Sequence, residues 1–378
     1  MHILCALGVL CGEGSASRIP FRRFSMRSIF IGSTGGEPGQ TLATWALAVK
    51  LKAKGVQVGF FKPYGLLPEL GPSAEGSFCD SDATLLKEVL DLAEPAEALC
   101  PVVLTENLIA EVSGSHEDRL IEKIEKAFQE TSRGKDVVLI MGAKEIFFGG
   151  GLSRLSDSLL VKLFNASVLL VDRYQRDNLT LYSLLSLNSF LDGRVKTAIL
   201  NHVALDKMDH VKTKVIPFLQ GKGLKSVAAI PESPILAAST VFTIADLIDG
   251  QILCCSEFGG NLIKTFTIGS KYLEGPLAIF KQVYNKIILV GLEEKGAGKN
   301  LVGGIILTGG KSPGDLVLRV AQERSIPLIL TRSDTFQTME RLEKAKPSLG
   351  VKDEFKVRQF LELMDQATDS DQWVEALL

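Results

Sequence analysis

The sequence has little net charge and few histidines, and each scarcity excludes a class of function. Lysine and arginine number 42 against 44 aspartates and glutamates, which leaves a net charge of −2. Such a balance supplies no long-range field to hold a polyanion, so we expect no nucleic-acid partner. Ser-His-Asp and Cys-His catalysis have no support, because the histidines stand far apart and outside any nucleophile motif (His2, His116, His202 and His210).

The sequence also lacks paired cysteine motifs. Its six cysteines form no C-x-x-C pair and have no clustered histidines beside them (Cys5, Cys11, Cys79, Cys100, Cys254 and Cys255). A disulfide framework and a zinc site are therefore not indicated. Buried thiols in a reducing compartment fit this pattern best, and we expect a cytoplasmic protein.

Long apolar runs are missing as well. No stretch approaches 18 uninterrupted apolar residues, so we expect no membrane span. The short run from Ile3 to Leu10 imitates a secretory signal, but no lysine or arginine precedes it. Met26 and the strand-like run behind it are typical of the start of a nucleotide-binding α/β domain. We therefore interpret residues 1–25 as a disordered or mis-started leader.

What the sequence does contain is a regular alternation of buried strands and helices. Apolar residues make up 46% of the chain and charged residues 23%, which is typical of sheets covered on both faces. Valine- and isoleucine-rich runs alternate with segments of helical periodicity, which predicts an α/β fold with a mostly parallel sheet. We expect strands at 28–31, 57–61, 136–141, 167–171, 196–201 and 226–230, and helices at 41–54, 83–90 and 117–131.

The length of 378 residues predicts two domains, because single cores rarely grow so large. We place the boundary near Asp249, so that residues 26–249 form the first domain. Residues 250–365 form a smaller α/β domain, and 366–378 a C-terminal tail. In the second domain the βαβ pattern returns in compact form, with strands at 251–255, 287–290, 303–307 and 327–330 and helices at 314–323 and 335–344.

A glycine-rich loop between the first strand and the first helix is the strongest local signal. The run is Ile29-Phe-Ile-Gly-Ser-Thr-Gly-Gly-Glu-Pro-Gly-Gln-Thr41. Small residues let consecutive N–H groups curl round a phosphate at a helix N-terminus, where the peptide dipoles favour negative charge. This P-loop pattern predicts a nucleotide site, and the open alternative is a turn that binds nothing. The candidate residues are Gly32, Ser33, Thr34, Gly35, Gly36, Gly39, Gln40 and Thr41.

Gln40 departs from the P-loop pattern, which expects lysine before Thr41. That lysine neutralises charge during phosphoryl transfer, whereas glutamine donates hydrogen bonds but brings no cation. Losing such a charge costs about 3 kcal/mol or more of transition-state stabilisation. We therefore predict nucleotide binding without efficient turnover.

Three polar residues after the second strand extend the candidate site. Lys62 ends that strand at the sheet edge where α/β ligand crevices open, and the alternative is an ordinary solvated lysine after a strand. Asp80 and Asp82, together with the Thr41 hydroxyl, are candidate ligands for Mg²⁺. The alternative for both carboxylates is capping the helix that follows.

The ends of two further strands are also informative. Met141 stands where P-loop domains often present an acid to the metal, and Glu145 is a weak substitute. Asn201 ends the strand 196–201, and its amide offers both a donor and an acceptor to a nucleobase edge. An asparagine that simply closes the strand into a turn is the open alternative.

In the second domain, two strands run into polar turns at what we expect to be one sheet edge. Thr308, Gly309 and Gly310 follow one strand, and Asp334 and Thr335 follow the other. They predict a polar pocket or a subunit contact, and the alternative is a tight turn with a helix cap.

Taken in order, these motifs resemble the N-terminal region of long bacterial phosphotransacetylases and their free-standing relatives. That region pairs a dethiobiotin-synthetase-like P-loop domain (an AAA domain) with a DRTGG domain. The resemblance covers nearly all of the chain from Arg27 to about Leu361. It rests on the loop 31–41, Val58-Gly-Phe-Phe-Lys-Pro63, Asp80-Ser-Asp-Ala83, Cys100-Pro-Val-Val-Leu-Thr105, Asp136-Val-Val-Leu-Ile-Met-Gly142, Ile230-Pro-Glu-Ser-Pro-Ile-Leu-Ala-Ala238, Ile306-Leu-Thr-Gly-Gly310 and Asp334-Thr-Phe336.

The resemblance implies regulation and assembly rather than acetyl transfer, since no acetyl-transfer domain follows Leu378. Besides Gln40 and Met141, the run Leu289-Val-Gly-Leu-Glu-Glu294 departs from the DRTGG namesake and weakens the case for adenine-nucleotide sensing there. Self-association through the second domain is less affected.

We therefore expect a nucleotide-responsive regulatory or assembly protein that binds ATP or another nucleotide, with Mg²⁺ as a candidate companion. We expect it to form homo-oligomers through its C-terminal domain, to act on a partner enzyme of unknown identity, and to catalyse little or nothing. The alternative is an ATP-dependent ligase of the dethiobiotin or cobyrinic acid a,c-diamide synthase type, using Lys62 and a metal held by Thr41. A purely structural descendant is the third hypothesis.

Overall fold

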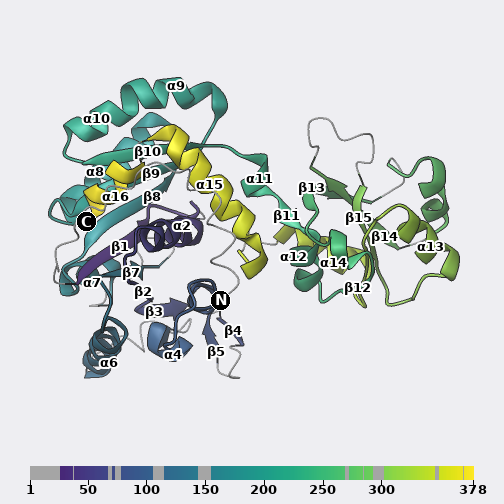
Figure 1. Cartoon of the computed structure of the whole chain (residues 1–378), viewed down its shortest axis with the longest axis horizontal. Coiled ribbons are helices and arrows are strands. Elements are labelled where there is room, and N and C mark those ends of the chain that lie inside the picture. The colour runs from purple at the N-terminus through teal and green to yellow at the C-terminus, as the bar shows by residue number, and fades with distance from the viewer. Residues whose placement is uncertain are drawn as a thin grey trace.

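The computed structural model describes residues 26–36, 38–66, 70–72, 78–104, 115–143, 155–268, 272–283, 285–292, 302–344, 349–368 and 370–378. The predicted leader at residues 1–25 and the candidate Glu145 lie outside the described residues. Figure 1 shows two lobes side by side, each built on its own sheet.

The first lobe is built on a six-stranded sheet in the order β10-β9-β8-β1-β7-β2, and every neighbouring pair is parallel. This confirms the predicted α/β fold. Five of the strands are buried over nearly their whole length, as expected of a parallel sheet covered on both faces. The strands are β1 (Arg27–Ser33), β2 (Val58–Phe61), β7 (Val137–Met141), β8 (Ser167–Arg173), β9 (Val195–Val203) and β10 (Ser226–Pro231).

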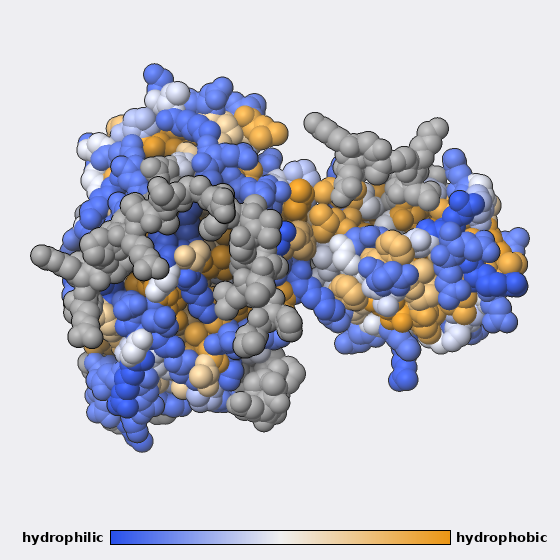
Figure 2. Space-filling view, viewed as in Figure 1, coloured by the Kyte–Doolittle hydropathy of each residue, from blue (hydrophilic) through white to orange (hydrophobic). Residues whose placement is uncertain are grey.

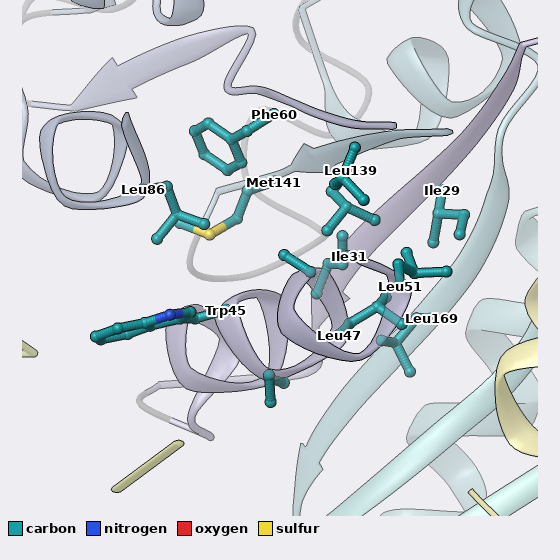
Figure 3. Close-up of a cluster of buried hydrophobic side chains, with 14 of the residues drawn as sticks. Ile29, Ile31, Trp45, Leu47, Leu51, Phe60, Leu86, Leu139, Met141 and Leu169 are labelled. Atoms are coloured by element: carbon teal, nitrogen blue, oxygen red, sulfur yellow. The ribbon is translucent and has the colours of Figure 1, made fainter. Parts of the chain in front are cut away.

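Side-chain alternation along the strands divides the core of this lobe in two. Ile29 and Ile31 face the core beneath α2 (Gln40–Ala53), while Phe30 between them faces the other core. Figure 3 shows Leu47 and Leu51 of α2 near Ile31 and Leu169, whereas Trp45 points away from them. The same core holds α3 (Ser81–Val89) and α4 (Ala96–Leu99).

The opposite core lies under helices that the sequence predicted only in part. The helix expected at 117–131 is present as α6 (Ser115–Thr131). The others escaped prediction, and they are α7 (Asp157–Leu163), α8 (Asp177–Phe190), η2 (Leu205–Lys207), α9 (Met208–His210), the π-turn η3 (Val211–Val215) and α10 (Ile216–Gly221). Two short ladders flank the lobe, formed by β3 (Tyr64–Leu66) with β6 (Val102–Leu104) and by β4 (Leu70–Pro72) with β5 (Phe78–Asp80).

The second lobe has a mixed sheet in the order β11-β13-β14-β15-β16-β12, so the expected βαβ repetition is wrong for most of it. Only β15 and β16 pair in parallel. The strands β14 and β15 are antiparallel, because the ten residues between them are too few for a helical crossover. The strands are β11 (Ser239–Thr240), β12 (Gln251–Cys254), β13 (Leu262–Thr267), β14 (Lys286–Gly291), β15 (Val302–Leu307) and β16 (Leu328–Leu330).

Helices cover both faces of this second sheet. One face packs against α12 (Val241–Leu247) and α14 (Thr335–Lys344). The other packs against η5 (Gly275–Gln282) and α13 (Asp315–Glu323). The remaining elements are α11 (Pro234–Ala237), which leads from the first lobe, and η4 (Ser256–Phe258).

The C-terminal helices return to the first lobe, which corrects the expected assignment of residues through 365 to the second domain and of 366–378 to a tail. After η6 (Val351–Asp353) come α15 (Glu354–Ala367) and α16 (Ser370–Leu377). Phe360 and Met364 of α15 and Trp373 of α16 belong to the core beneath α2. In Figure 1, α15 runs from the junction of the lobes across the first sheet.

Among the described residues, no helix combines the length and the apolar character needed to cross a bilayer.

Replacing Phe360 with alanine should show that α15 is part of the first core. Phe360 is only 1% exposed and lies in the core beneath α2. Phe360→Ala should therefore lower the free energy of unfolding, measured by urea titration, by about 3–5 kcal/mol. The matched change Tyr182→Ala removes a ring that is 73% exposed in the same lobe and should cost less than about 0.5 kcal/mol. Equal effects of the two substitutions would contradict the packing of α15.

Candidate functional site

The loop between β1 and α2 turns sharply at Gly39, which is the N-cap of α2. Gly39 has φ 92° and ψ 29°, a left-handed backbone conformation that residues other than glycine rarely adopt. A Cβ at this position would also lie 2.8 Å from the amide nitrogen of Asn201. The glycine before Gln40 is therefore required by backbone geometry and by close packing.

Asn201 holds this turn from beneath. Its side-chain amide donates to the carbonyl of Pro38 at 2.7 Å, and its oxygen accepts from the N–H of His202 at 2.9 Å. Both ends of the side chain are therefore used inside the protein, whereas the sequence suggested a contact with a nucleobase. As placed, Asn201 positions the loop.

The start of the loop is tied to β8. The Thr34 hydroxyl donates to Asp172, and the Thr180 hydroxyl donates to the other oxygen of that carboxylate at 2.7 Å. The Ser33 hydroxyl donates to the carbonyl of Gly35, two residues farther along the loop, at 2.6 Å. Asp172 was missed from the sequence, although a carboxylate directly behind a buried parallel strand was an available signal.

Gln40 points into the protein. Its side-chain nitrogen donates to the carbonyl of Ile31 at 2.7 Å and approaches that of Gly142 at 3.5 Å, so it joins the ends of β1 and β7. The residue is buried. The amide that replaces the expected lysine therefore serves as a link between strands.

The backbone N–H groups at the start of α2 offer the site for an anion. Helix geometry leaves the N–H groups of the first turn without intrahelical acceptors. The described hydrogen bonds supply no other acceptor for the N–H groups of Gln40 and Thr41. An added Cβ at Gly35 or Gly36 would meet nothing within 4 Å, so open space borders the glycines that lead into this turn. The segment thus keeps features of a phosphate cradle.

Lys62 is buried between two carboxylates. Its ammonium lies 2.8 Å from Asp80 and 2.7 Å from Asp82, and the Thr41 hydroxyl donates to the second oxygen of Asp82 at 2.8 Å. One Asp80 oxygen also accepts the N–H groups of Asp82 and Ala83 and so caps α3. The structure thus brings together all four residues that the sequence proposed at this edge, and it bears out the capping role of Asp80.

The charges in this group stabilise one another. Burial by itself lowers the pKa of Lys62, but the carboxylates of Asp82 and Asp80 outweigh it and raise that pKa above its ordinary value. Burial raises the pKa of Asp80, and the Lys62 ammonium opposes that rise. The other oxygen of Asp80 is buried with no hydrogen-bond partner among the described residues.

As arranged, this group does not fit a divalent cation. The Lys62 ammonium already pairs with the two carboxylates that Mg²⁺ would need, and the Thr41 hydroxyl is turned toward Asp82. Met141, at the position where an acid was sought, is buried in the core near Phe60 and Leu86 (Figure 3). Within the described part of the chain, no three His, Cys, Asp or Glu side chains are grouped as metal ligands.

Asp157 at the start of α7 is a buried carboxyl that the sequence gave no reason to select. It accepts the Tyr64 hydroxyl at 2.8 Å and the N–H of Ala143 at 2.9 Å. Burial raises its pKa to about 7, although these two hydrogen bonds and the Lys62 charge pull the other way. Asp157 therefore joins the ends of β7 and β3, and only the fold brings these segments together.

In the second lobe, the predicted residues do meet at one sheet edge. The hydroxyls of Thr308 and Thr335 lie 2.7 Å apart, and Gly309 and Gly310 donate to the carbonyls of Ser333 and Thr331. Asp334 accepts the N–H of Gln337 and caps α14. Of the predicted residues, Gly310 lines the neighbouring pocket of about 580 Å³. The favoured alternative, a tight turn with a helix cap, accounts for the rest.

Comparison with known families matches two models to the chain. The model described as AAA domain matches residues 27–240, and the model described as DRTGG domain matches residues 243–345. This agrees with the pair of domains expected from the motifs.

Curated relatives similar to the chain are named phosphate acetyltransferases. That of Pseudomonas putida strain KT2440 is 24% identical over 350 residues, which cover 87% of this chain and 48% of the relative. That of Synechocystis sp. strain PCC 6803 is 19% identical over 367 residues, covering 93% and 52%. The chain thus spans about half the length of these relatives.

Solved structures with a similar fold include MinD, a septum site-determining protein from Pyrococcus horikoshii, in complex with Mg-ADP. It is 15% identical, with a TM-score of 0.33, and the match covers 56% of this chain and 84% of that one. A plasmid partition protein from Borrelia burgdorferi is 12% identical, with a TM-score of 0.35, covering 54% and 91%.

The raised pKa of Asp157 predicts a pH-dependent contribution to stability. Between pH 3.8 and about 7 the folded chain keeps a proton on Asp157 that the unfolded chain has lost. The contribution of this group is thus fully present below pH 3.8 and is lost as the pH rises to about 7. Asp157→Asn cannot titrate, so the stability of the wild type relative to this variant should fall over that interval.

Urea titrations at a series of pH values measure this difference, with the exposed Asp206→Asn as the control. A difference between wild type and Asp157→Asn that stays constant with pH would disprove the assignment.

Proposed function

The chain belongs to the AAA domain family, and on that premise we propose that it is a nucleotide-responsive regulatory or assembly protein with little or no catalysis of its own. It consists of a P-loop NTPase-like domain and a DRTGG domain, homologous to the N-terminal region of phosphate acetyltransferases. The proposal concerns what the loop between β1 and α2 binds and what it does with the bound group.

The direction of the Gln40 side chain carries the proposal. Its amide donates to the carbonyls of Ile31 and Gly142 and brings no positive charge to the loop. A phosphate at the start of α2 would meet the N–H groups of the first turn and the positive end of the helix dipole. These interactions support binding. Phosphoryl transfer needs a further cationic group to neutralise the charge that develops on the transferred group.

Lys62, the candidate for that cation in the sequence, is already paired. Removing its ammonium would leave the buried carboxylate of Asp80 and the half-buried carboxylate of Asp82 without a counter-charge, which is strongly unfavourable. This pairing supports a structural role for Lys62. It also supports nucleotide binding that does not depend on Mg²⁺.

The alternative function is that of an ATP-dependent ligase or amidating enzyme of the dethiobiotin or cobyrinic acid a,c-diamide synthase type. The observation that favours it is the grouping of Thr41, Lys62, Asp80 and Asp82 at the edge where the parallel strands end. For this function Lys62 would have to leave Asp82, which would free the carboxylate and the Thr41 hydroxyl for a metal ion.

We also propose where the protein is located, how it associates and what it acts on. We place the protein in the cytoplasm as a homo-oligomer that associates through its second lobe and acts on a partner enzyme.

Calorimetric titration with ATP and ADP, combined with an assay for phosphate release, tests the proposal. We expect binding of both nucleotides, little change in affinity when Mg²⁺ is added, and no phosphate release. Release that requires Mg²⁺ and is abolished in Thr41→Ala would establish the ligase alternative. Failure of both nucleotides to bind would refute both functions and leave a structural role.

Substituting lysine for Gln40 should restore the missing cation. If the loop cradles phosphate, Gln40→Lys should tighten ATP binding about tenfold, because a hydrogen bond to a charged donor is stronger than one to an amide. Gln220→Lys makes the same exchange at an exposed position of α10 and should leave the affinity unchanged. Equal affinities of Gln40→Lys and the wild type would show that a lysine at position 40 does not reach the ligand.

A further inference from the structure

A second cavity lies where the two lobes meet, away from the loop between β1 and α2. It encloses about 590 Å³, within the range of small-molecule sites, which are often found between domains. It is lined by Ser233, Pro234, Ile235, Lys264, Thr265, Tyr272, Val290, Gly291, Leu292 and Gln359. These residues come from α11, from β13 and β14 and the segments beside them, and from α15. Figure 2 shows apolar residues gathered at this junction.

Two β-bulges shape the wall that the second lobe contributes. Along β13 and β14, Ile263 pairs with Gly291 and Thr265 with Val290, so Lys264 is an extra residue in β13. Along β14 and β15, Leu289 pairs with Gly304 and Val290 with Val302, so Gly303 is extra in β15. A bulge bends its strand and redirects a side chain, and bulges are frequent beside binding sites. Here the redirected side chain is Lys264.

The chemistry of the lining selects the class of ligand. The described lining has one positive charge, on Lys264, and no carboxylate. Hydroxyls of Ser233, Thr265 and Tyr272 and the amide of Gln359 supply hydrogen-bonding groups. The remaining surface is largely apolar and comes from Pro234, Ile235, Val290 and Leu292. This combination suits a molecule with an anionic group on a small apolar body.

We propose that this cavity is a second binding site, for a small organic anion such as a carboxylate or a phosphate monoester with an apolar body. Lys264 pairs with the anionic group, and the apolar residues of α11 and β14 receive the body of the ligand. Ligand binding in this cavity does not require a nucleotide in the first lobe.

The same cavity is connected to the nucleotide loop through α15. Gln359 lines the cavity, and its neighbour Phe360 is buried in the core shared with α2. Farther along α15, Asp365 forms an ion pair with Lys50 of α2 at 2.8 Å. In η6, just before α15, the Lys352 ammonium lies 3.6 Å from the ring centre of Phe242 in the second lobe. A ligand in the cavity therefore contacts a helix that packs directly on the helix whose N-terminus forms the loop.

Benzoate and phenyl phosphate are suitable probes, because they carry a carboxylate and a phosphate on the same apolar ring. Benzyl alcohol is the neutral counterpart. Calorimetry and saturation-transfer NMR on the full chain without nucleotide should show saturable binding of at least one of the two anions at millimolar concentration. The comparison of the two anions identifies which anionic group the site prefers.

Two variants test whether the probes bind in this cavity. Lys264→Ala should weaken binding of the preferred anion about fivefold and leave benzyl alcohol unaffected, since it removes only the charge interaction. Thr265→Trp places a large ring in the cavity from an exposed position and should abolish binding of every probe. Lys311→Ala removes an exposed charge elsewhere in the second lobe and should change nothing.

Absence of saturable binding by the wild type, or equal binding by the wild type and Thr265→Trp, would overturn the proposal. Because nucleotide is not added, these outcomes do not depend on the function proposed for the first lobe. Hydrogen exchange measured with and without the preferred anion tests the connection. The amides of α2 should exchange at a different rate, while those of α6 on the opposite face of the sheet should not. Unchanged exchange in α2 would disprove the connection.

Discussion

The buried ammonium of Lys62 is the interaction on which the candidate site depends. It lies at the end of β2 and joins Asp80, which caps α3, to Asp82, which in turn accepts the hydroxyl of Thr41 in α2. Three elements that are separate in sequence are therefore held together by one charge. Buried carboxylates without that charge would be costly, so the pairing constrains how β2, α2 and α3 can be arranged. This cost also governs what the site can do, since any metal ion must compete with a cation that is already present.

Three polar side chains round the loop form hydrogen bonds within the protein. Gln40 is bonded to the ends of β1 and β7, Asn201 to Pro38, and Thr34 to Asp172. Each of these contacts rigidifies the loop, and each removes a side chain from those free to contact a ligand. What remains for an anion is mainly the backbone at the start of α2. Such a site recognises charge and shape, and it offers little to drive a reaction, which is the physical basis for proposing a regulatory role.

The two lobes are connected more closely than a simple linear order of domains would imply. The chain leaves the first lobe through α11, builds the second sheet, and returns through α15 to complete the core beneath α2. The cavity between the lobes is lined by both crossing segments. The helix α15 belongs to the first core and also borders the cavity between the lobes. It is therefore well placed to transmit the effect of ligand binding in the cavity to the loop before α2, and the effect of binding at that loop to the cavity.

The sequence by itself determined the parallel sheet of the first lobe, most of its strands, and the glycine-rich turn into α2. These follow from local signals, namely short apolar runs, helical periodicity and the need for glycine at a left-handed position. It also selected Lys62, Asp80, Asp82 and Thr41 as candidate site residues, because Lys62 ends a parallel strand, Thr41 begins the helix after the glycine-rich loop, and carboxylates are suitable ligands for Mg²⁺. Only the tertiary structure decided that Lys62 pairs with both carboxylates, that Gln40 turns inward and that Asp157 joins the ends of β7 and β3. The return of α15 to the first core and the antiparallel pairing of β14 with β15 were likewise beyond local pattern. These outcomes depend on which distant groups share a buried space, and burial makes each unpaired charge or amide too costly to leave alone.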